Sequence, residues 1–225
     1  IEETSMKRIA FIAALFALTA CTAKEKPAEA TTSADPDKAA AGGALPAGYM
    51  ARTDKPDASM SDARYSASGD EWEVNTGPAH VMYDPKVMGN GNYTASASVE
   101  QLEAPTHPEA YGIFIGGRDL DKPTEAYTYF LIRGTGDVAI KVREGDATRD
   151  VIAWAPSADV PKADASGKAK YDLSVQVANG AVKFMVNGKQ VASASAAGLP
   201  TDGIAGLRIN HNLHVKVKPV SITAP

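Results

Sequence analysis

The sequence predicts an all-β domain, an antiparallel β-sandwich of two sheets, over residues 69–225. Apolar and polar residues alternate through several segments of the second half of the chain, for example 137–143 and 171–177. Turn signals rich in Gly and Asn separate these segments, and none has the 3.6-residue period of an amphipathic helix. Many short strands with frequent turns are typical of sandwiches and barrels.

The clearest strands have one apolar face each, because alternate side chains of a strand point to opposite sides. Segment 137–143 places Val138, Ile140 and Val142 on one face. The expected strands are 127–133, 137–143, 171–177, 181–187, 207–210 and 213–220. Residues 134–136, Asn179-Gly180 and Asn187-Gly188 lie between strands as turns, and Asn-Gly is the strongest short hairpin signal.

Several pieces of the sequence, taken in order, resemble the concanavalin A-like and laminin G-like jelly roll. They are similar as well to the 3-keto-disaccharide hydrolase domains of secreted bacterial proteins. The pieces are Asp70–Val74 with Gly77, Tyr111–Leu120, Tyr127–Arg133, Val182–Val191 and Gly203–Asn210. The most telling part is the Asn-Gly hairpin followed by Gly-x-x-Gly-Leu-Arg. The resemblance covers residues 70–222 and implies a jelly-roll fold, while fold alone leaves function open.

The N-terminal part predicts a lipoprotein signal peptide at residues 6–20. Lys7 and Arg8 precede an uncharged apolar run of ten residues, Ile9–Leu18, which is too short to span a bilayer as a helix. Leu18-Thr19-Ala20-Cys21 then resembles the bacterial lipobox, which implies lipid transfer to Cys21 and cleavage before it. Two or more acyl chains would anchor the chain stably. The alternative is a plain secretory signal with an incidental cysteine.

Four segments are expected in all. Residues 1–5 form an upstream extension, 6–20 the signal helix, 21–68 the acylated Cys21 with a flexible linker, and 69–225 the sandwich. The linker is rich in Ala, Pro, Lys, Glu and Ser, and cannot bury enough apolar surface to offset its ordering entropy. Alternatively, part of 48–65 packs on the domain as an irregular arm. The resemblance to Gram-negative lipoproteins implies that Thr22, in place of an Asp after the cysteine, directs the chain to the outer membrane of a bacterial cell envelope, facing the periplasm or the cell surface.

Composition and motifs argue against several functions. The net charge of −4 lacks the basic excess of a nucleic-acid binder, and the single cysteine excludes a Cys-based zinc cluster. No Glu-x-Asp-x-x-Glu strand of a retaining glucanase is present, and Asp119 and Asp121 are typical of a turn. His211 and His214 could bring two imidazoles to one metal, but exposed histidines in a turn are favoured. No catalytic residue, metal or cofactor is therefore expected.

The candidate binding residues lie on the polar face of the expected strands. If Phe130 and Ile132 point inward, the neighbouring polar side chains point outward and gather on one sheet face. These residues are Tyr127, Tyr129, Arg133, Lys141, Arg143, Arg208 and Asn210. Aromatic rings beside planar hydrogen-bonding groups suit a sugar, and the cations suit acidic groups. A solvated sheet face without a ligand is the alternative.

These observations favour a non-catalytic β-sandwich, anchored to membrane lipid through Cys21, that binds carbohydrate or a partner protein at the surface. Two alternatives stay open. One is an enzyme that acts on modified sugars, as the 3-keto-disaccharide hydrolase resemblance implies, and it requires histidines that converge with carboxylates in one pocket. The other is a structural envelope lipoprotein, whose mark would be a large exposed apolar patch.

Overall fold

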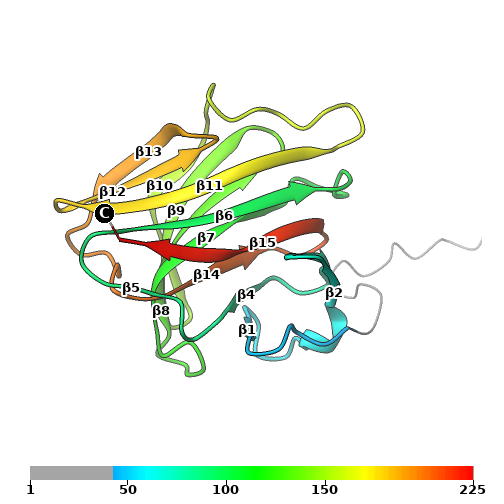
Figure 1. The fold of residues 1–225 in the computed structure, drawn as a ribbon, viewed down its shortest axis with the longest axis horizontal. Helices are drawn as coiled ribbons and strands as arrows, with labels where there is room; N and C mark the ends of the chain where they lie inside the picture. The colour runs from blue at the N-terminus through cyan, green and yellow to red at the C-terminus, as the bar shows by residue number, and fades with distance from the viewer. Residues whose placement is uncertain (1–42, 225) are drawn as a thin grey trace, which may run out of the picture. The chain divides into compact units, whose positions relative to one another are not determined.

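The computed structural model describes residues 43–224, which fold into two antiparallel β-sheets packed face to face (Figure 1). The fold class is that predicted, a β-sandwich. The expected signal peptide at 6–20, Cys21 and the first half of the expected linker lie outside the described residues. Among the described residues the model has one 3-10 turn, Met60–Asp62, and no α-helix. Within that part of the chain, no helix has the length and apolarity needed to cross a membrane.

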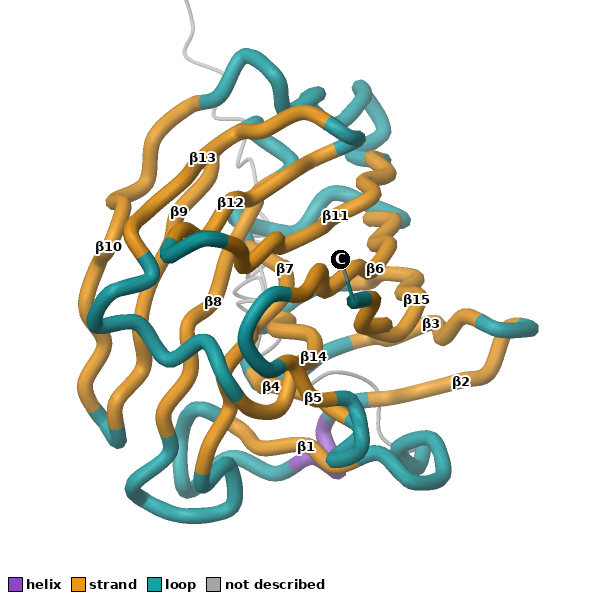
Figure 2. Tube along the Cα trace, turned by 60° about the vertical axis from the view of Figure 1, so that its left-hand side comes forward, coloured by secondary structure: helices purple, strands orange, loops and turns teal. Residues whose placement is uncertain are grey.

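Eight strands form the first sheet, and every neighbouring pair is antiparallel. Across the sheet they are β1 (Met50–Thr53), β4 (His80–Tyr83), β14 (Gly203–Ile209), β7 (Ala110–Arg118), β8 (Ala126–Arg133), β9 (Asp137–Glu144) and β10 (Ala147–Pro156), with β5 (Met88–Gly89) pairing with β14. Because β14 lies between β4 and β7, the sheet joins segments that are far apart in the sequence, as Figure 2 shows.

Seven strands form the second sheet, which is also antiparallel throughout. In order they are β13 (Lys189–Ser195), β12 (Ala181–Val186), β11 (Ala169–Ala178), β6 (Tyr93–Gln101), β15 (His214–Thr223), β3 (Glu71–Asn75) and β2 (Arg64–Ser68). The hairpin turns follow the prediction. Asn179 and Gly180 have φ of 52° and 75°, and Asn187 and Gly188 have 50° and 77°, the positive values that a two-residue I′ turn requires.

The main core lies between the two sheets and is built by the predicted alternation. Ile132 and Phe130 of β8 and Ile140 of β9 are fully buried, as are the apolar positions of β11 and β12 that face them. The rings of Phe130 and Phe184 lie 4.8 Å apart across the sandwich. Burial of such side chains contributes about 1.5–3 kcal/mol each, so the core of this domain needs no disulfide.

The folded domain begins earlier than residue 69. β1 and β2 both lie in the expected linker, where an irregular arm on residues 48–65 was the alternative, and both are strands of the two sheets. Tyr65 of β2 is 5% exposed in the main core. β1 has only four residues and no buried side chain. No apolar pattern in the sequence therefore marks it as a strand. Pairing with β4, the ion pair of Arg52 with Glu125 and that of Asp54, directly after the strand, with Arg208 hold it in place instead.

Candidate functional site

The outer face of the eight-stranded sheet, which points away from the main core, carries a second cluster of apolar and aromatic side chains. The outer-face cluster comprises Val81, Tyr83, Ala110, Phe114, Leu120, Tyr127, Tyr129 and Leu131, with Trp154 and Ile204 packed against it. The ring of Tyr127 lies 5.4 Å from that of Tyr129 and 5.2 Å from that of Phe114. Tyr127 and Tyr129 are 2% and 7% exposed, so they form the floor of this face.

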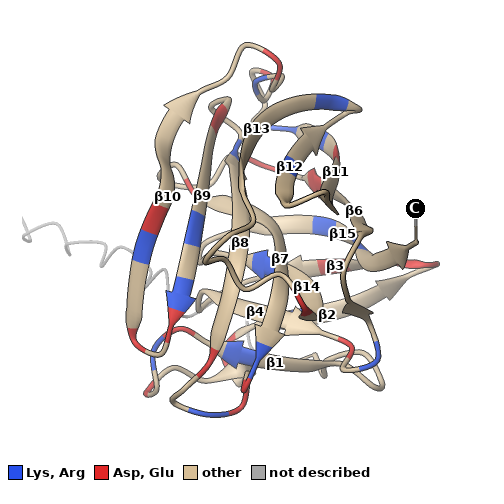
Figure 3. Ribbon diagram, turned by 90° about the vertical axis from the view of Figure 1, so that its left-hand side faces the viewer, with Lys and Arg blue, Asp and Glu red and all other residues tan. Residues whose placement is uncertain are grey.

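The register of β8 and β9 brings the predicted basic residues next to these tyrosines. Tyr129 lies opposite Lys141, and Tyr127 lies opposite Arg143. Directly opposed side chains on one face of an antiparallel pair are in contact range. Figure 3 shows the strands of this sheet side by side, with basic segments on β9 and mixed charges on β10. Lys141 Nζ lies 2.7 Å from Asp150 Oδ1 of β10, an acidic side chain that is 47% exposed.

Arg208 of β14 extends the same face toward the other edge of the sheet. Its guanidinium binds both carboxylate oxygens of Asp54, and its Cζ lies 5.9 Å from the ring centroid of Tyr129. The Arg208 side chain is 7% exposed. Burial opposes its charge, but the attraction of the Asp54 carboxylate outweighs that effect, so the pKa of Arg208 is raised above its usual value.

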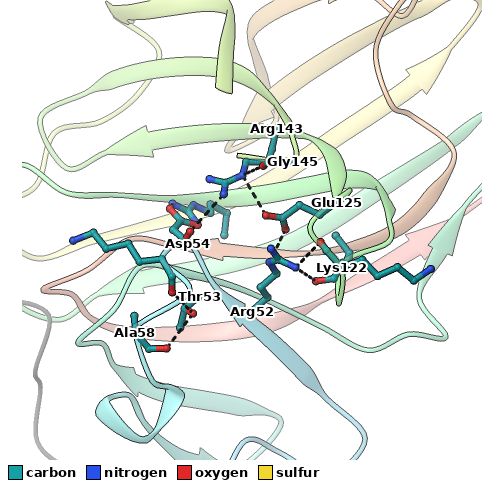
Figure 4. Close-up of polar contacts among 11 residues, drawn as sticks. Arg52, Thr53, Asp54, Ala58, Lys122, Glu125, Arg143 and Gly145 are labelled. Atoms are coloured by element: carbon teal, nitrogen blue, oxygen red, sulfur yellow. Dashed lines mark hydrogen bonds and ion pairs between the residues drawn. The ribbon is translucent and has the colours of Figure 1, made fainter. Parts of the chain in front are cut away.

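Arg143 takes part in an ion-pair network that the sequence did not predict (Figure 4). Glu125, with 2% of its side chain exposed, forms two ion pairs. Its Oε1 lies 3.2 Å from Arg143 Nε, and its Oε2 lies 3.2 Å from Arg52 Nε. Arg143 Nε also donates to the carbonyl of Gly145 at 2.6 Å. Arg52 Nη1 donates to the carbonyl of Lys122 at 2.6 Å. The two guanidinium groups are thus held in fixed orientations and share one carboxylate.

Arg133 and Asn210 lie toward the end of the same sheet. Arg133 stacks on Trp154 of β10, with Cζ 3.8 Å from the ring centroid. Alternation did not single out Trp154, because β10 changes register twice between Asp150 and Ala155 and bulges break the period of two. Asn210 donates from Nδ2 to Glu109 Oε2 at 3.2 Å, so it belongs to a group at the sheet end rather than to the tyrosine floor.

A pocket of about 240 Å³ opens beside Arg208. Asp54, Arg208, Asn210 and His211 line it, so it combines a carboxylate, a cation, an amide and an imidazole. A second pocket of about 240 Å³ is lined by His107 and Glu109, among others. The two pockets approach each other where His211 meets Glu109.

The four histidines lie in three different surroundings. His211 and His107 both contact Glu109, which was not predicted because His211 lies about a hundred residues from the other two. His214 does not join His211; its Nε2 lies 2.8 Å from Glu73 Oε1 on the second sheet. His80 is fully buried and bonded to Tyr65. His211 therefore converges with a second histidine and a carboxylate, and the pairing of His211 with His214, which the sequence left open but did not favour, does not form.

The acidic residues considered for glycoside hydrolysis lie in a turn, as predicted. Asp119 has φ of 49° and accepts a hydrogen bond from Lys122 Nζ at 2.7 Å. That pair lies on the surface, where solvent screens the attraction between the two charges. These two residues therefore close the connection between β7 and β8.

Comparison with known proteins yields similarity in structure only. No protein-family model matches the sequence, and no curated protein matches it. Among solved structures, the chain is similar to the carbohydrate binding module CBM66 from Bacillus subtilis, with a TM-score of 0.57 and 12% identity over 79% of this chain and 96% of that chain. It is also similar to sheep galectin-11, with a TM-score of 0.44 and 11% identity over 61% of this chain and 93% of that chain. Alginate lyase A1-II′ gives a TM-score of 0.45 and 15% identity over 72% of this chain and 78% of that chain. At 12% identity, the first similarity shows a shared jelly-roll fold.

Proposed function

We propose that this domain binds carbohydrate that carries acidic groups, on the outer face of the eight-stranded sheet. The observation that carries the proposal is the row of cations beside an aromatic floor, in which Lys141 and Arg143 lie opposite Tyr129 and Tyr127. The similarity in fold to a carbohydrate binding module supports the same class of ligand.

The exposure of the side chains assigns different roles to the floor and to the groups above it. Tyr127 and Tyr129 are buried and shape the surface. Trp154 and Arg133 are half-buried and stacked on each other, so a flat π surface and a planar cation are available together. Sugar faces pack on aromatic rings, and carboxylates or sulfates accept from guanidinium and ammonium groups. Lys141 can exchange its exposed partner Asp150 for a ligand anion at little cost, because surface ion pairs are weak.

The test is binding of the full chain to a panel of neutral and acidic polysaccharides by affinity electrophoresis. We expect retardation by an acidic polysaccharide, weakened about tenfold or more by Lys141→Ala and by Arg133→Ala. The matched control is Lys170→Ala on the second sheet, which removes another lysine with an acidic partner, Glu100, at 3.5 Å. Equal binding by all four proteins, or no retardation on any polysaccharide, would rule out this face.

We also propose that the chain is a lipoprotein, anchored through Cys21 to the outer membrane of a bacterial envelope. The proposal is supported by the apolar run and the Leu18-Thr19-Ala20-Cys21 pattern of the sequence. The test is mass spectrometry of the N-terminal peptide from isolated membranes, which should begin at an acylated Cys21. Cys21→Ala should release the protein from the membrane fraction. An unmodified Cys21 thiol would contradict the proposal.

One observation favours a second candidate function, an enzyme that acts on modified sugars. That function requires a histidine and a carboxylate in one pocket, and His107 and Glu109 meet this requirement in the second pocket, where His211 also contacts Glu109. The test is product formation from a 3-keto-disaccharide, which Glu109→Gln should abolish. Absence of any product with the unchanged chain leaves the non-catalytic binding module as the better proposal.

A further inference from the structure

Three metal-ligating side chains converge at the end of the sandwich. His107 Nδ1 lies 2.9 Å from Glu109 Oε1, and His211 Nε2 lies 3.0 Å from the same oxygen. The donor atoms of all three residues lie within 4.8 Å of one another. Among the described residues, these three form the only group of His, Cys, Asp or Glu side chains that could hold a metal ion in this way. The two imidazole rings are 5.2 Å apart. We refer to His107, Glu109 and His211 as the two-histidine cluster.

The fold holds this cluster with two loops that are fastened to each other. His107 and Glu109 lie between β6 and β7, and His211 lies in the turn between β14 and β15. Asn212 Nδ2 donates to Thr106 Oγ1 at 2.6 Å, which joins the turn to the loop. Asn210 Nδ2 donates to Glu109 Oε2 at 3.2 Å, so the second carboxylate oxygen is occupied and the first is left to the histidines.

The turn itself is fixed from the other side by a buried threonine. Thr76 Oγ1 donates to the carbonyl of Asn210 at 2.7 Å, and Thr76 N–H donates to the carbonyl of Leu213 at 2.8 Å. His211 is therefore presented from a backbone that is bonded on both sides. Such support around the ligating residues is what a preorganised metal site requires.

The geometry suits a small transition-metal ion. Ligand atoms at about 2.0–2.2 Å from a tetrahedral metal are about 3.3–3.6 Å apart, so the two histidine–glutamate separations need to widen by a few tenths of an ångström. The donor atoms of the two histidines lie within 4.8 Å of each other and would have to approach by up to about 1.5 Å. Glu109 is 7% exposed, and a carboxylate buried to this degree is costly without compensating positive charge. Two imidazoles and one carboxylate are a donor set that catalytic zinc sites use, with further positions open.

We propose that the two-histidine cluster binds one divalent transition-metal ion of the zinc class, with at least one coordination position open to an exogenous ligand. The open position follows from the pockets. His211 lines the pocket beside Arg208, and His107 and Glu109 line the second pocket, so solvent reaches the cluster from both. This inference does not rest on the binding of carbohydrate.

The surroundings of His214 show why the proposal is confined to one cluster. His214 contacts Glu73 and Glu103, whose side chains are 44% and 65% exposed, and it is the single imidazole there. Exposed carboxylates are already solvated by water, so a metal ion would stabilise them less than it would stabilise a buried carboxylate. His214 therefore provides a matched control, a histidine that also contacts glutamate but lies outside the cluster.

The test is metal binding by the full chain after treatment with a chelator. Zn²⁺ is titrated against a chromophoric chelator, and Co²⁺ is added separately to record its ligand-field absorption bands. We expect one Zn²⁺ per chain and Co²⁺ bands of a four- or five-coordinate site with nitrogen ligands. His107→Ala and Glu109→Gln should each weaken Zn²⁺ binding by more than tenfold and remove the Co²⁺ bands. His214→Ala should change neither.

A further variant separates a metal site from a hydrogen-bonded cluster. Asn210→Ala leaves all three ligands but removes the bond to Glu109 Oε2, and it should weaken Zn²⁺ binding about 10–100-fold, as loss of an outer-shell partner does. Circular dichroism establishes that each variant folds. The side chain of His107 is 46% exposed, so His107→Ala is the substitution that should disturb folding least. Binding at less than one ion per chain, or equal binding by His107→Ala and the unchanged chain, would overturn the proposal.

Discussion

The Asp54 carboxylate binds the Arg208 guanidinium with both of its oxygens. This pair joins the segment after β1 to the middle of the eight-stranded sheet, across a sequence separation of 154 residues. Arg208 also lies beside the ring of Tyr129. Within the described part of the chain, β1 and Asp54 therefore belong to the folded domain and complete the outer face of this sheet.

Removal of Asp54 should strongly destabilise the domain, because it leaves the buried Arg208 charge without its partner. We expect Asp54→Ala to lower the free energy of unfolding by about 3 kcal/mol, since breaking a buried pair typically costs 3–5 kcal/mol and Asp54 is partly exposed. Urea denaturation measures the change. The double variant with Arg208→Met should lose less than the sum of the two single variants. Asp57→Ala, on an exposed neighbour, is the control. Equal losses from Asp54→Ala and Asp57→Ala would contradict the ion-pair account.

Gly112 of β7 should not tolerate a side chain. It lies opposite Arg208 on one side and Leu131 on the other, and a Cβ atom placed on it would lie 1.8 Å from the Phe130 carbonyl oxygen. Because that oxygen belongs to the backbone of a central strand, relief requires the strands to separate. We expect Gly112→Ala to lower the free energy of unfolding by about 3 kcal/mol, at the upper end for overpacking.

Gly180→Ala is the matched control for Gly112→Ala. Nothing lies within 4 Å of a Cβ atom at Gly180, and its cost arises only from the positive φ of 75°. We expect a loss of about 1 kcal/mol, the cost of placing a non-glycine residue in the left-handed region. A Gly112→Ala protein that unfolds at the same urea concentration as Gly180→Ala would show that β7 and β8 are not packed as described.

Trp154 should report ligand binding on the outer face. The chain has two tryptophans, and Trp72→Phe leaves Trp154, which is half-buried and stacked under Arg133. We expect the fluorescence emission of this variant to shift when an acidic polysaccharide that binds the chain is added, because the contact changes the polarity around the indole. Trp154→Phe, which keeps Trp72, should show no shift. A shift in the second variant alone would place the ligand elsewhere.

The central strands of the domain could be predicted from the sequence because one face of each strand packs on the main core and the other does not. Val138, Ile140 and Val142 of β9 lie at every second position, and the structure buries all three. Asn179-Gly180 marks its hairpin because few residues accept positive φ at both turn positions. Local patterns of this kind were sufficient to predict two sheets and their fold class.

The candidate site could be predicted only where it follows from alternation within a strand. Tyr127 and Tyr129 share a face for that reason, but Arg52 and Asp54 are brought to it by strand order, which a single sequence does not encode locally. The meeting of His107 with His211 depends on two loops at one end of the sandwich. Neither has a recognisable spacing, so only the fold reveals them.

His80 should make the stability of the domain depend on pH. It is fully buried in β4; its Nδ1 donates to the Pro78 carbonyl at 2.8 Å, and its Nε2 accepts from the Tyr65 hydroxyl. Burial disfavours the charged imidazolium and lowers the pKa of His80 to about 4. In the unfolded chain the pKa of this histidine is its ordinary value of 6.5.

The sign of the effect follows from proton binding in the two states. Between pH 6.5 and about 4 the unfolded chain binds a proton at His80 that the folded domain does not bind. The free energy of unfolding therefore falls as the pH decreases through this window, by up to about 3 kcal/mol, and His80 adds no pH dependence above it. Urea denaturation at several pH values from 4 to 8 measures the slope. His80→Asn, which can still donate to the Pro78 carbonyl but does not titrate, should show a smaller fall over the same range, because the other titrating groups are common to both proteins. Parallel curves for the two proteins would mean that His80 is protonated to the same extent in the folded and unfolded states.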